Sequence, residues 1–408
     1  MTAPRAAPVR IALIAGEASG DHLGAALIDA LAARLPHLET FGVGGAEMLG
    51  RGFSSCFAMS EIAVMGPVAI LRRLPQLLAR IRQTAAYVVD ARPDLVVIID
   101  CPEFSHRVAR RVRKAMPGLA IIDYVAPSVW AWRPGRARAM RAYVDEVMAL
   151  LPFEPEMFAR LGGPRCRYVG HPAVERAAAD AARIDSLRAR AAADGRPLLA
   201  VMPGSRMNEL RRLNGPFRDA LAILAAADRP PAVVIPTLPH LEPGLAREAA
   251  GWPLRPLVVS AEPDRRAAMA AADAALVASG TATLELALAR TPMVVAYRAE
   301  PLFAWIRHFF PIHSIVLANL VHGGAPVPEF YQGRCTGRRL AAAVAPLLVA
   351  GPEREAQLRA LDEIARKVTG DGTPPSERAA EIVLEALAAA AAGTVSARAA
   401  GRPAGAAG

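Results

Sequence analysis

Short apolar runs alternate with amphipathic stretches through the first half of the chain. Four of the runs have the length of buried strands: Val9–Ala15, Leu95–Asp100, Ala120–Val125 and Glu146–Leu151. Leucines at every fourth position from Leu23 to Leu35 predict an amphipathic helix over His22–Leu35. Continuously apolar strands separated by helices are typical of a parallel sheet that is covered on both faces.

The same alternation starts again after a polar, Ala- and Arg-rich helix predicted near Asp180–Asp194, which we interpret as a connector. Five further strands are predicted: Leu198–Met202, Ala232–Pro236, Leu257–Ser260, Ala275–Ala278 and Met293–Tyr297. From about Arg338 to Ala391 the pattern is helical, with breaks near Gly351–Pro352 and Gly370–Pro375. The pattern therefore predicts an α/β protein with two Rossmann-like domains and C-terminal helices.

At 408 residues the chain is too long for one ordinary hydrophobic core. We expect an N-terminal domain over residues 1–172 and a second domain over residues 173–345. Helices over 346–391 pack back on the first domain or on a partner, and the Ala/Gly/Arg tail over 392–408 is disordered. Two such domains face a cleft, and open parallel sheets bind ligands at the carboxyl ends of their strands.

The formal charge of +10 raises the question of nucleic-acid binding. All basic residues except Lys114 and Lys367 are arginines, and they are spread along the chain with acids between them. No DNA- or RNA-recognition motif accompanies the charge. We therefore expect no nucleic acid as a partner, and the basic surface faces solvent, phosphate groups or an anionic membrane.

The cysteines and the apolar runs bear on the compartment. Cys56, Cys101, Cys166 and Cys335 lie far apart without a C-x-x-C motif, which predicts reduced thiols, no metal ligation and a cytoplasmic location. The apolar run from Ile11 is too short for a signal peptide, and no run of 18 uncharged apolar residues occurs.

The first strand is followed by Gly16–Asp21, which reads Gly-Glu-Ala-Ser-Gly-Asp. This segment is either a plain strand-to-helix turn, with Ser19 or Asp21 as the N-cap, or a loop that binds a ligand. Two acids and no lysine argue against a phosphate loop. Glu17, Ser19 and Asp21 suit the hydroxyl groups of a sugar better.

Asp100 stands at the tip of the second buried strand, where a carboxylate is costly unless it faces a cleft. It is a candidate general base for an attacking hydroxyl, or else it caps the following turn, and Glu103 competes with it for the catalytic role. A later loop contains two of the four tryptophans, Trp130 and Trp132. Tryptophans stack on sugar rings and also fill cores, and both interpretations stay open.

Two turns in the second half are suited to a nucleotide. Met202–Arg206 is a strand followed by a tight turn, in which Ser205, Arg206 and the backbone amides suit a diphosphate, unless it is a plain turn with a surface arginine. In Ala278–Glu285, small residues end a strand and begin a helix, and Glu285 lies one turn inside. A carboxylate there can bind ribose hydroxyls or merely stabilise the helix N-terminus.

In the segment from Ile62 to Ile81, large apolar residues are crowded together with Arg72, Arg73 and Arg80, and Arg82 follows directly after it. A core helix explains this pattern. Alternatively, it is an exposed apolar patch with a basic rim, which would contact a membrane or acyl chains.

Taken together, these stretches resemble the lipid-A-disaccharide synthase family, membrane-associated glycosyltransferases of the GT-B fold. The matching stretches cover about residues 9–335 in order: Gly16–Asp21, Ala63–Gly66, Asp100–Phe104, Tyr124–Arg133, Leu151–Glu154, Val169–His171, Pro203–Arg206, Ala278–Glu285, Pro292–Arg298, Asn319 and Val327–Gln332. The tryptophan loop is highly specific for this family.

The resemblance implies transfer of 2,3-diacylglucosamine from UDP-2,3-diacylglucosamine to 2,3-diacylglucosamine 1-phosphate, with inversion, giving a β-1,6-linked lipid A disaccharide 1-phosphate and UDP. It implies no metal or other cofactor, peripheral contact with the cytoplasmic face of the inner membrane, and leaves a homodimer possible. By position, Asp100 is the base. Around UDP it places Arg206, Gly280, Thr281, Glu285, Asn319 and Gln332, and in the apolar membrane patch Val68, Ile70, Leu71, Leu74, Leu77 and Leu78.

The sequence departs from the family pattern in one place. The common D-x-P-D-F-N pattern reads Asp-Cys-Pro-Glu-Phe-Ser over 100–105, so Asp100 is kept while the second acid and the Asn are replaced. Three other classes of protein compete with this interpretation: a UDP-sugar epimerase of the same fold, a non-enzymatic lipid carrier, and a basic nucleic-acid binder.

Overall fold

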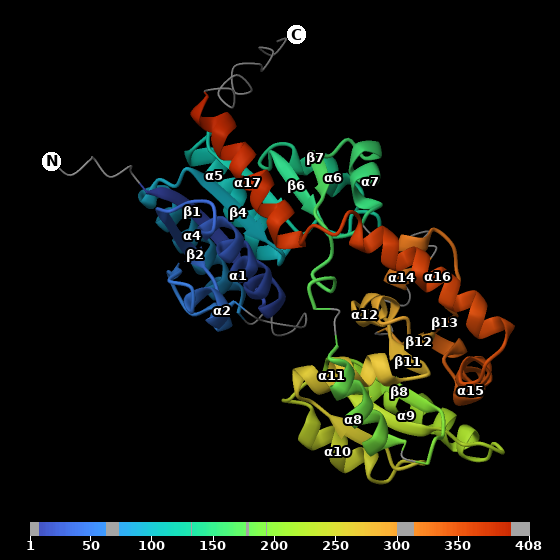
Figure 1. Cartoon of the computed structure of the whole chain (residues 1–408). Helices are drawn as coiled ribbons and strands as arrows, with labels where there is room; N and C mark the ends of the chain where they lie inside the picture. Colours follow the sequence, from blue (N-terminus) through green and yellow to red (C-terminus); the bar gives the residue numbers. More distant parts are fainter. Residues whose placement is uncertain are drawn as a thin grey trace. The chain divides into compact units, whose positions relative to one another are not determined.

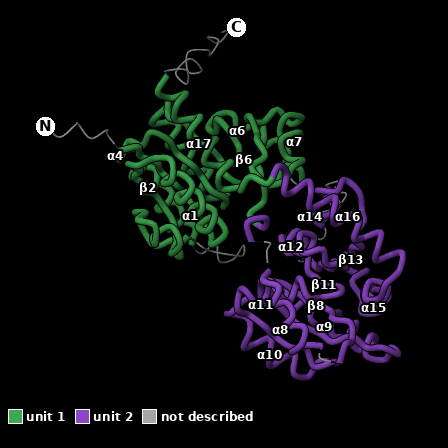
Figure 2. Tube along the Cα trace, in the orientation of Figure 1, with its two compact units in different colours: residues 1–172, 372–408 green, residues 173–371 purple. Residues whose placement is uncertain are grey.

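The structure is a computed structural model that describes residues 8–62, 73–131, 133–176, 179–192, 194–299 and 314–392. The chain forms two compact units, each drawn in its own colour in Figure 2. Unit 1 comprises residues 1–172 and 372–408, and unit 2 comprises residues 173–371. Each unit contains a parallel sheet between helices, which confirms the predicted α/β class (Figure 1).

The sheet of unit 1 has seven parallel strands in the order β3-β2-β1-β4-β5-β6-β7. The strands are β1 (Val9–Ala15), β2 (Leu38–Val43), β3 (Ser54–Ser55), β4 (Leu95–Ile99), β5 (Ala120–Tyr124), β6 (Glu146–Ala149) and β7 (Arg165–Tyr168). In the register, Ala15 of β1 pairs with Ile99 of β4, and Ile99 pairs with Tyr124 of β5. The carboxyl ends of the three central strands therefore lie side by side.

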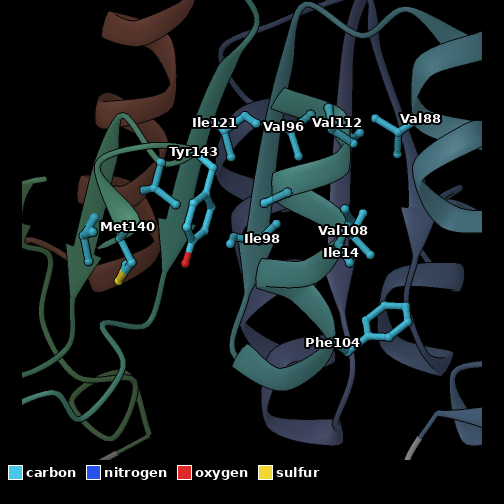
Figure 3. Packing of buried hydrophobic residues seen from close by; sticks show 14 of the residues in the cluster. Ile14, Val88, Val96, Ile98, Phe104, Val108, Val112, Ile121, Met140 and Tyr143 are labelled. Atoms are coloured by element: carbon cyan, nitrogen blue, oxygen red, sulfur yellow. The ribbon is translucent and has the colours of Figure 1, made fainter. Parts of the chain in front are cut away.

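Helices cover both faces of this sheet. They are α1 (Ala18–Ala32), α2 (Ala46–Leu49), α4 (Leu74–Ala91), α5 (Pro102–Ala115), α6 (Gly135–Met140), α7 (Glu154–Arg160), α17 (Pro375–Ala391) and the 3-10 turn η1 (Met59–Glu61). On one face, Ile14, Val96 and Ile98 pack against Val108 of α5 and Val88 of α4 (Figure 3).

The alternate strand residues pack on the other face. Leu13, Val97 and Ile122 join a core with α1 and with Ile382 and Val383 of α17. Successive residues of a strand point to opposite faces, so burial on both faces explains why these strands are apolar without interruption. The helix α17 lies far along the sequence but packs on α1 within unit 1 (Figure 1).

The sheet of unit 2 has six parallel strands in the order β10-β9-β8-β11-β12-β13. They are β8 (Leu198–Met202), β9 (Ala232–Pro236), β10 (Leu257–Val259), β11 (Ala274–Ala278), β12 (Met293–Tyr297) and β13 (Glu329–Tyr331). Strand β11 pairs with β8 on one side and with β12 on the other. The six strands thus follow the same order as β3-β2-β1-β4-β5-β6 in unit 1.

The helices of unit 2 pack against its strands and against one another. They are α8 (Ala181–Ala191), α9 (Met207–Ala225), α10 (Glu242–Ala249), α11 (Glu262–Ala271), α12 (Ala282–Leu288), α14 (Leu317–His322), α15 (Gly337–Val344), α16 (Pro352–Thr369) and the 3-10 turns η3 (Gln332–Arg334) and η4 (Ala345–Leu347). One core unites Phe217 of α9 and Leu340 of α15 with Val201, Leu276 and Val294 of the strands.

Local features differ from the sequence-based expectation at two kinds of place. Strands β2, β7 and β13 carry polar residues, so their pattern did not predict strands. The N-cap of α1 is Glu17, and the helix begins at Ala18, so the prediction of Ser19 or Asp21 as the N-cap was wrong. Asp21 lies inside the first turn, where its side chain bonds to another segment instead.

Within the described residues, no helix is both long enough and apolar enough to cross a membrane. The predicted apolar patch is described only in part, because Val68, Ile70 and Leu71 lie outside the described residues. Of the remainder, Leu74 is 37% exposed at the start of α4, while Leu77 and Leu78 are partly buried against the core.

Candidate active site

The strand order of unit 1 reverses direction between β1 and β4. From β1 the sheet continues to β2 on one side, whereas β4 continues to β5 on the other. Open parallel sheets bind ligands in the crevice outside such a switch point, at the carboxyl ends of the strands. The segments that leave β1 and β4 there are Gly16–Asp21 and Asp100–Glu103, so topology brings two separately predicted motifs to one edge.

Asp100 is partly exposed and is held by hydrogen bonds to both carboxylate oxygens. Ser19 Oγ donates to Oδ2 at 3.0 Å, and the Cys101 amide donates to Oδ1 at 2.8 Å. Its backbone is left-handed (φ 52°), as is that of Cys101 (φ 48°), and Ser105 Oγ donates to the Asp100 carbonyl at 2.7 Å. A left-handed backbone at two consecutive non-glycine residues is strained. The hydrogen bonds to the carboxylate and to the carbonyl of Asp100 stabilise this conformation and fix the position of the carboxylate.

Glu103, the competing acid, is surrounded by arginines. Its carboxylate lies 2.9 Å from Arg136, 3.4 Å from Arg107 and 3.5 Å from Arg133. Burial acts to raise the pKa of Glu103, but these guanidinium groups outweigh burial and hold its pKa below the usual range. A carboxylate so strongly paired is a poor proton acceptor, which leaves Asp100 as the better candidate.

The three polar residues of the first loop lie in different environments. Glu17 is partly exposed at the N-cap of α1, and Ser19 is exposed and bonded to Asp100. Asp21 is 5% exposed, and its oxygens accept hydrogen bonds from three backbone amides, those of Gly45 (2.7 Å), Glu47 (3.0 Å) and Met48 (3.2 Å). Asp21 therefore holds the start of α2, and we leave it out of the proposed sugar site.

The tryptophan loop follows β5, the strand next to β4. Trp130 is partly exposed, whereas its neighbour Val129 is 2% exposed and anchors the loop in the core. The indole Nε1 of Trp130 donates to Glu154 Oε1 at 3.2 Å, and the ring meets Phe153 edge-on. Trp132, the second predicted sugar-binding tryptophan, lies outside the described residues.

The sheet of unit 2 has its own switch point, between β8 and β11. Pro203–Arg206 leaves β8 there, and Ser279–Glu285 leaves β11. The two turns predicted for a nucleotide therefore lie at the carboxyl ends of adjacent strands, because β8 and β11 pair directly.

The turn after β8 holds an acid that the sequence analysis passed over. Glu209 Oε2 accepts a hydrogen bond from the Ser205 amide at 2.9 Å, and Oε1 lies 3.5 Å from the Arg206 guanidinium. Arg206 is the N-cap of α9, and its side chain is 57% exposed. The Ser205 amide and the Arg206 guanidinium thus both lie against the carboxylate of Glu209.

The turn after β11 places Thr281, which is exposed, at the N-cap of α12, and Gly280 is partly exposed beside it. Glu285 lies in a pocket with arginines from α11 and from the segment after β7; the lining residues are Ala173, Arg176, Glu262, Arg265, Arg266, Met269, Glu285 and Ala289. Burial raises the pKa of Glu285, while Arg176 and Arg265 act against that rise. The lining of this pocket therefore brings two carboxylates, those of Glu262 and Glu285, together with three guanidinium groups.

Two further residues predicted around UDP differ in how their side chains are engaged. Asn319 is 1% exposed. Its side-chain amide donates to the Val327 carbonyl at 2.9 Å and accepts from the Val327 backbone amide at 3.0 Å. Gln332 is partly exposed, adopts a left-handed backbone (φ 50°) and donates to the Ala299 carbonyl at 3.4 Å. Asn319 shapes the loop before β13, whereas Gln332 lies at the carboxyl end of that strand.

No group of three or more acidic, His or Cys side chains suited to a metal ion occurs among the residues that the structure describes. The four cysteines are free thiols. The polar groups described above at the two edges are carboxylates, hydroxyls, guanidinium groups and backbone amides.

Comparison with known proteins identifies the family. The lipid-A-disaccharide synthetase family model matches residues 11–383. The lipid-A-disaccharide synthase of Nitrobacter winogradskyi is 49% identical over 93% of this chain and 96% of its own length, and that of Ruegeria pomeroyi is 42% identical over 93% and 96%.

Solved structures share the fold at low identity. The S. aureus MnaA–UDP co-structure has a TM-score of 0.63 at 13% identity, covering 93% of this chain and 97% of that one. Acinetobacter baumannii MurG gives 0.57 at 15% identity, covering 93% and 100%. A UDP-GlcNAc 2-epimerase from Neisseria meningitidis also matches, at 0.58 and 10% identity over 94% and 100%. The fold therefore does not separate a transferase from an epimerase. The sequence matches do so: the chain belongs to the lipid-A-disaccharide synthase family and is a glycosyltransferase.

Proposed function

We propose that the chain transfers 2,3-diacylglucosamine from its UDP derivative to 2,3-diacylglucosamine 1-phosphate with Asp100 as the general base. The observation that carries this proposal is the position of Asp100 at the switch point of unit 1, hydrogen-bonded to Ser19 and clear of the arginines that occupy Glu103. Asp100 is partly exposed, its carboxylate is held by Ser19 and by the Cys101 amide, and no ion pair of Asp100 occurs within the described residues.

The acceptor half of the reaction belongs to unit 1 in this proposal. The 6-hydroxyl of the acceptor attacks the anomeric carbon of the donor, and its proton passes to Asp100 as the new C–O bond forms. Glu17 and Ser19 lie in the adjoining loop and can bind sugar hydroxyls. Trp130 adds a partly exposed aromatic ring from the loop after β5.

The donor half belongs to unit 2. Ser205 and Arg206 bind the diphosphate, Gly280 and Thr281 line the neighbouring turn, Glu285 binds the ribose, and Gln332 completes the edge. The bond from the anomeric carbon to the UDP oxygen breaks as the acceptor attacks, and the guanidinium of Arg206 stabilises the charge that UDP acquires. One displacement converts the α-linked donor into a β-linked product.

We also propose peripheral contact with the cytoplasmic face of the inner membrane. Leu74 exposes an apolar side chain next to Arg73 in the sequence, within the predicted patch, and the net charge of +10 favours an anionic lipid surface. Free cysteines are what a reducing compartment maintains. A homodimer stays a prediction.

The test is a mass-resolved transfer assay on the full chain with both proposed substrates. The wild type should form the disaccharide 1-phosphate, and Asp100→Asn should lower turnover by about 10²- to 10⁴-fold, the usual contribution of a positioned base. UDP affinity, measured by calorimetry, should stay unchanged because Asp100 is assigned no contact with UDP.

Glu103→Gln is the matched control, since it removes the other acid of the same segment. It should keep turnover within a few-fold of the wild type. Near-normal turnover of Asp100→Asn would remove Asp100 as the base, and a large loss in Glu103→Gln alone would transfer the role to that residue. Absence of any disaccharide from the wild type would refute the proposed reaction.

A further inference from the structure

Glu154 is a buried acid whose role neither the sequence motifs nor the proposed mechanism explains. It is 3% exposed at the start of α7, directly after the Leu-Pro-Phe segment that follows β6. No ion pair involves Glu154 within the described part of the chain, and a buried carboxylate without a cation costs folding free energy. The hydrogen bonds of Glu154 must therefore offset the cost of burying its carboxylate.

Both carboxylate oxygens of Glu154 accept hydrogen bonds, and each bond comes from a different segment. The Leu151 amide donates to Oε2 at 3.0 Å, which ties the side chain back onto its own turn. The Trp130 indole donates to Oε1 at 3.2 Å across 24 residues. A carboxylate can accept on both oxygens, whereas glutamine has only one accepting oxygen, so an acid is the residue type that satisfies both donors.

The bond joins the loops after two neighbouring strands, because β5 pairs with β6. Phe153 adds an edge-on contact to the Trp130 ring, with centroids 5.4 Å apart. The indole is thus fixed on one edge by Glu154 and packed by Phe153, while part of it stays exposed. An aromatic ring held in this way, beside the strand that carries Asp100, is suited to pack against the face of a pyranose.

We propose that Glu154 is a positioning residue, which orients the Trp130 indole so that its ring contacts the sugar of the acceptor. This inference rests on the proposed function, because it assigns the acceptor to unit 1. Glu154 itself touches no substrate and acts through Trp130. Loss of the Glu154 bond should therefore weaken acceptor binding and leave the donor site unaffected.

The protonation of Glu154 gives the arrangement a pH dependence. Burial raises the pKa of Glu154 to about 7, against the Leu151 and Trp130 hydrogen bonds that lower it. Above that pH the carboxylate accepts from both donors, and below it one oxygen carries a proton and the bonds weaken. The acceptor KM should therefore rise as the pH falls through about 7.

Two titratable groups of the described chain face Glu154, and neither has a pKa near 7. They are Cys166 and Tyr168 on β7, the strand against which α7 packs. Burial raises the pKa of both, that of Tyr168 to about 12. Arg378 lies over the Tyr168 ring, 6.0 Å from its centroid. The phosphate of the acceptor itself titrates near pH 6, so a variant without Glu154 has to supply the baseline.

The kinetic test compares Glu154→Gln, Trp130→Phe and the double variant in the full chain with both proposed substrates. Each single variant should raise the acceptor KM roughly tenfold, the scale of a charge-assisted hydrogen bond, with an unchanged donor KM. The acceptor KM of the double variant should be no higher than that of Trp130→Phe, because both changes remove the same hydrogen bond, the one between Trp130 and Glu154. Glu156→Gln is the matched control on the same helix, since Glu156 is 68% exposed.

A spectroscopic measurement keeps the inference testable without activity. In ¹⁵N-tryptophan-labelled protein, Trp130→Phe assigns the Trp130 indole N–H resonance. This resonance should shift with a midpoint near pH 7 in the wild type and in Glu156→Gln, and should be displaced and independent of pH in Glu154→Gln.

The outcomes separate this inference from the proposed function. An indole resonance unaffected by Glu154→Gln, or effects on the acceptor KM that add in the double variant, would overturn the inference. An unchanged acceptor KM in Trp130→Phe would also overturn it. If the disaccharide still forms in these cases, the proposed function is retained and only the role of Glu154 is lost. If the wild type forms no disaccharide, the proposed function itself is refuted.

Discussion

At the scale of single residues, carboxylates of one chemical type take different roles because their surroundings differ. Asp100 is partly exposed and bonded to a serine hydroxyl, Glu103 is bound by three arginines, and Asp21 is buried under three amides. The sequence placed all three in candidate ligand loops. Their partners come from segments up to 81 residues away, so the sequence pattern alone could not distinguish them.

Arg206 gives a prediction at this scale. Arg206→Ala should raise the donor KM by about tenfold or more, because it removes a charge-assisted bond to the diphosphate. The acceptor KM should not change. Arg218→Ala is the control, since Arg218 lies on the same helix, is also 57% exposed and forms a loose pair with Asp219 at 3.7 Å. Steady-state kinetics with varied donor decide the matter, and equal donor KM values for both variants would contradict the assignment of Arg206.

At the scale of elements, the apolar strands were predicted closely and the junctions were not. Strands β1, β8, β9 and β12 have the predicted bounds, because strands buried on both faces leave a continuous apolar signal. The polar strands β2 and β7 gave no such signal. The start of α1 was misplaced because Asp21 satisfies the amides of α2 rather than those of its own helix.

This cross-element bond leads to a stability prediction. Asp21→Ala leaves the amides of Gly45, Glu47 and Met48 without their acceptor and should cost roughly 3 kcal/mol of unfolding free energy. Asp29→Ala, on the same helix, should cost under about 1 kcal/mol because Asp29 is 58% exposed in a surface pair. Denaturant unfolding, together with hydrogen exchange of residues 45–48, provides the measurement. Equal stability of the two variants would show that Asp21 does not hold α2.

At the scale of the whole molecule, two facts come from topology. The helix α16 belongs to unit 2, while α17 belongs to unit 1 and buries Ile382 and Val383 in its core. Both helices are amphipathic, so their patterns alone do not decide which unit each one joins. The sheet orders likewise bring four short motifs to two switch points.

The membrane proposal is tested on the whole molecule. Leu74→Asp should lower binding to vesicles that contain anionic lipid by roughly tenfold, since it replaces an exposed apolar contact with a like-charged group. Binding of the wild type should also fall as salt is added. Ile223→Asp is the control, because Ile223 is 48% exposed on α9, compared with 37% for Leu74. Sedimentation with vesicles measures both, and an unchanged affinity of Leu74→Asp would count against this surface.

The sequence by itself determined the α/β class, most of the buried strands and the segments at which chemistry is expected, because periodicity and turn residues are local properties. Only the tertiary structure decided which acids stay accessible. In the folded chain, Asp21 accepts hydrogen bonds from the start of α2, and the side chain of Asn319 is bonded to the backbone of Val327. Glu154 accepts a hydrogen bond from the indole of Trp130. Hydrogen-bond partners and burial depend on contacts between distant segments, and strand order creates those contacts.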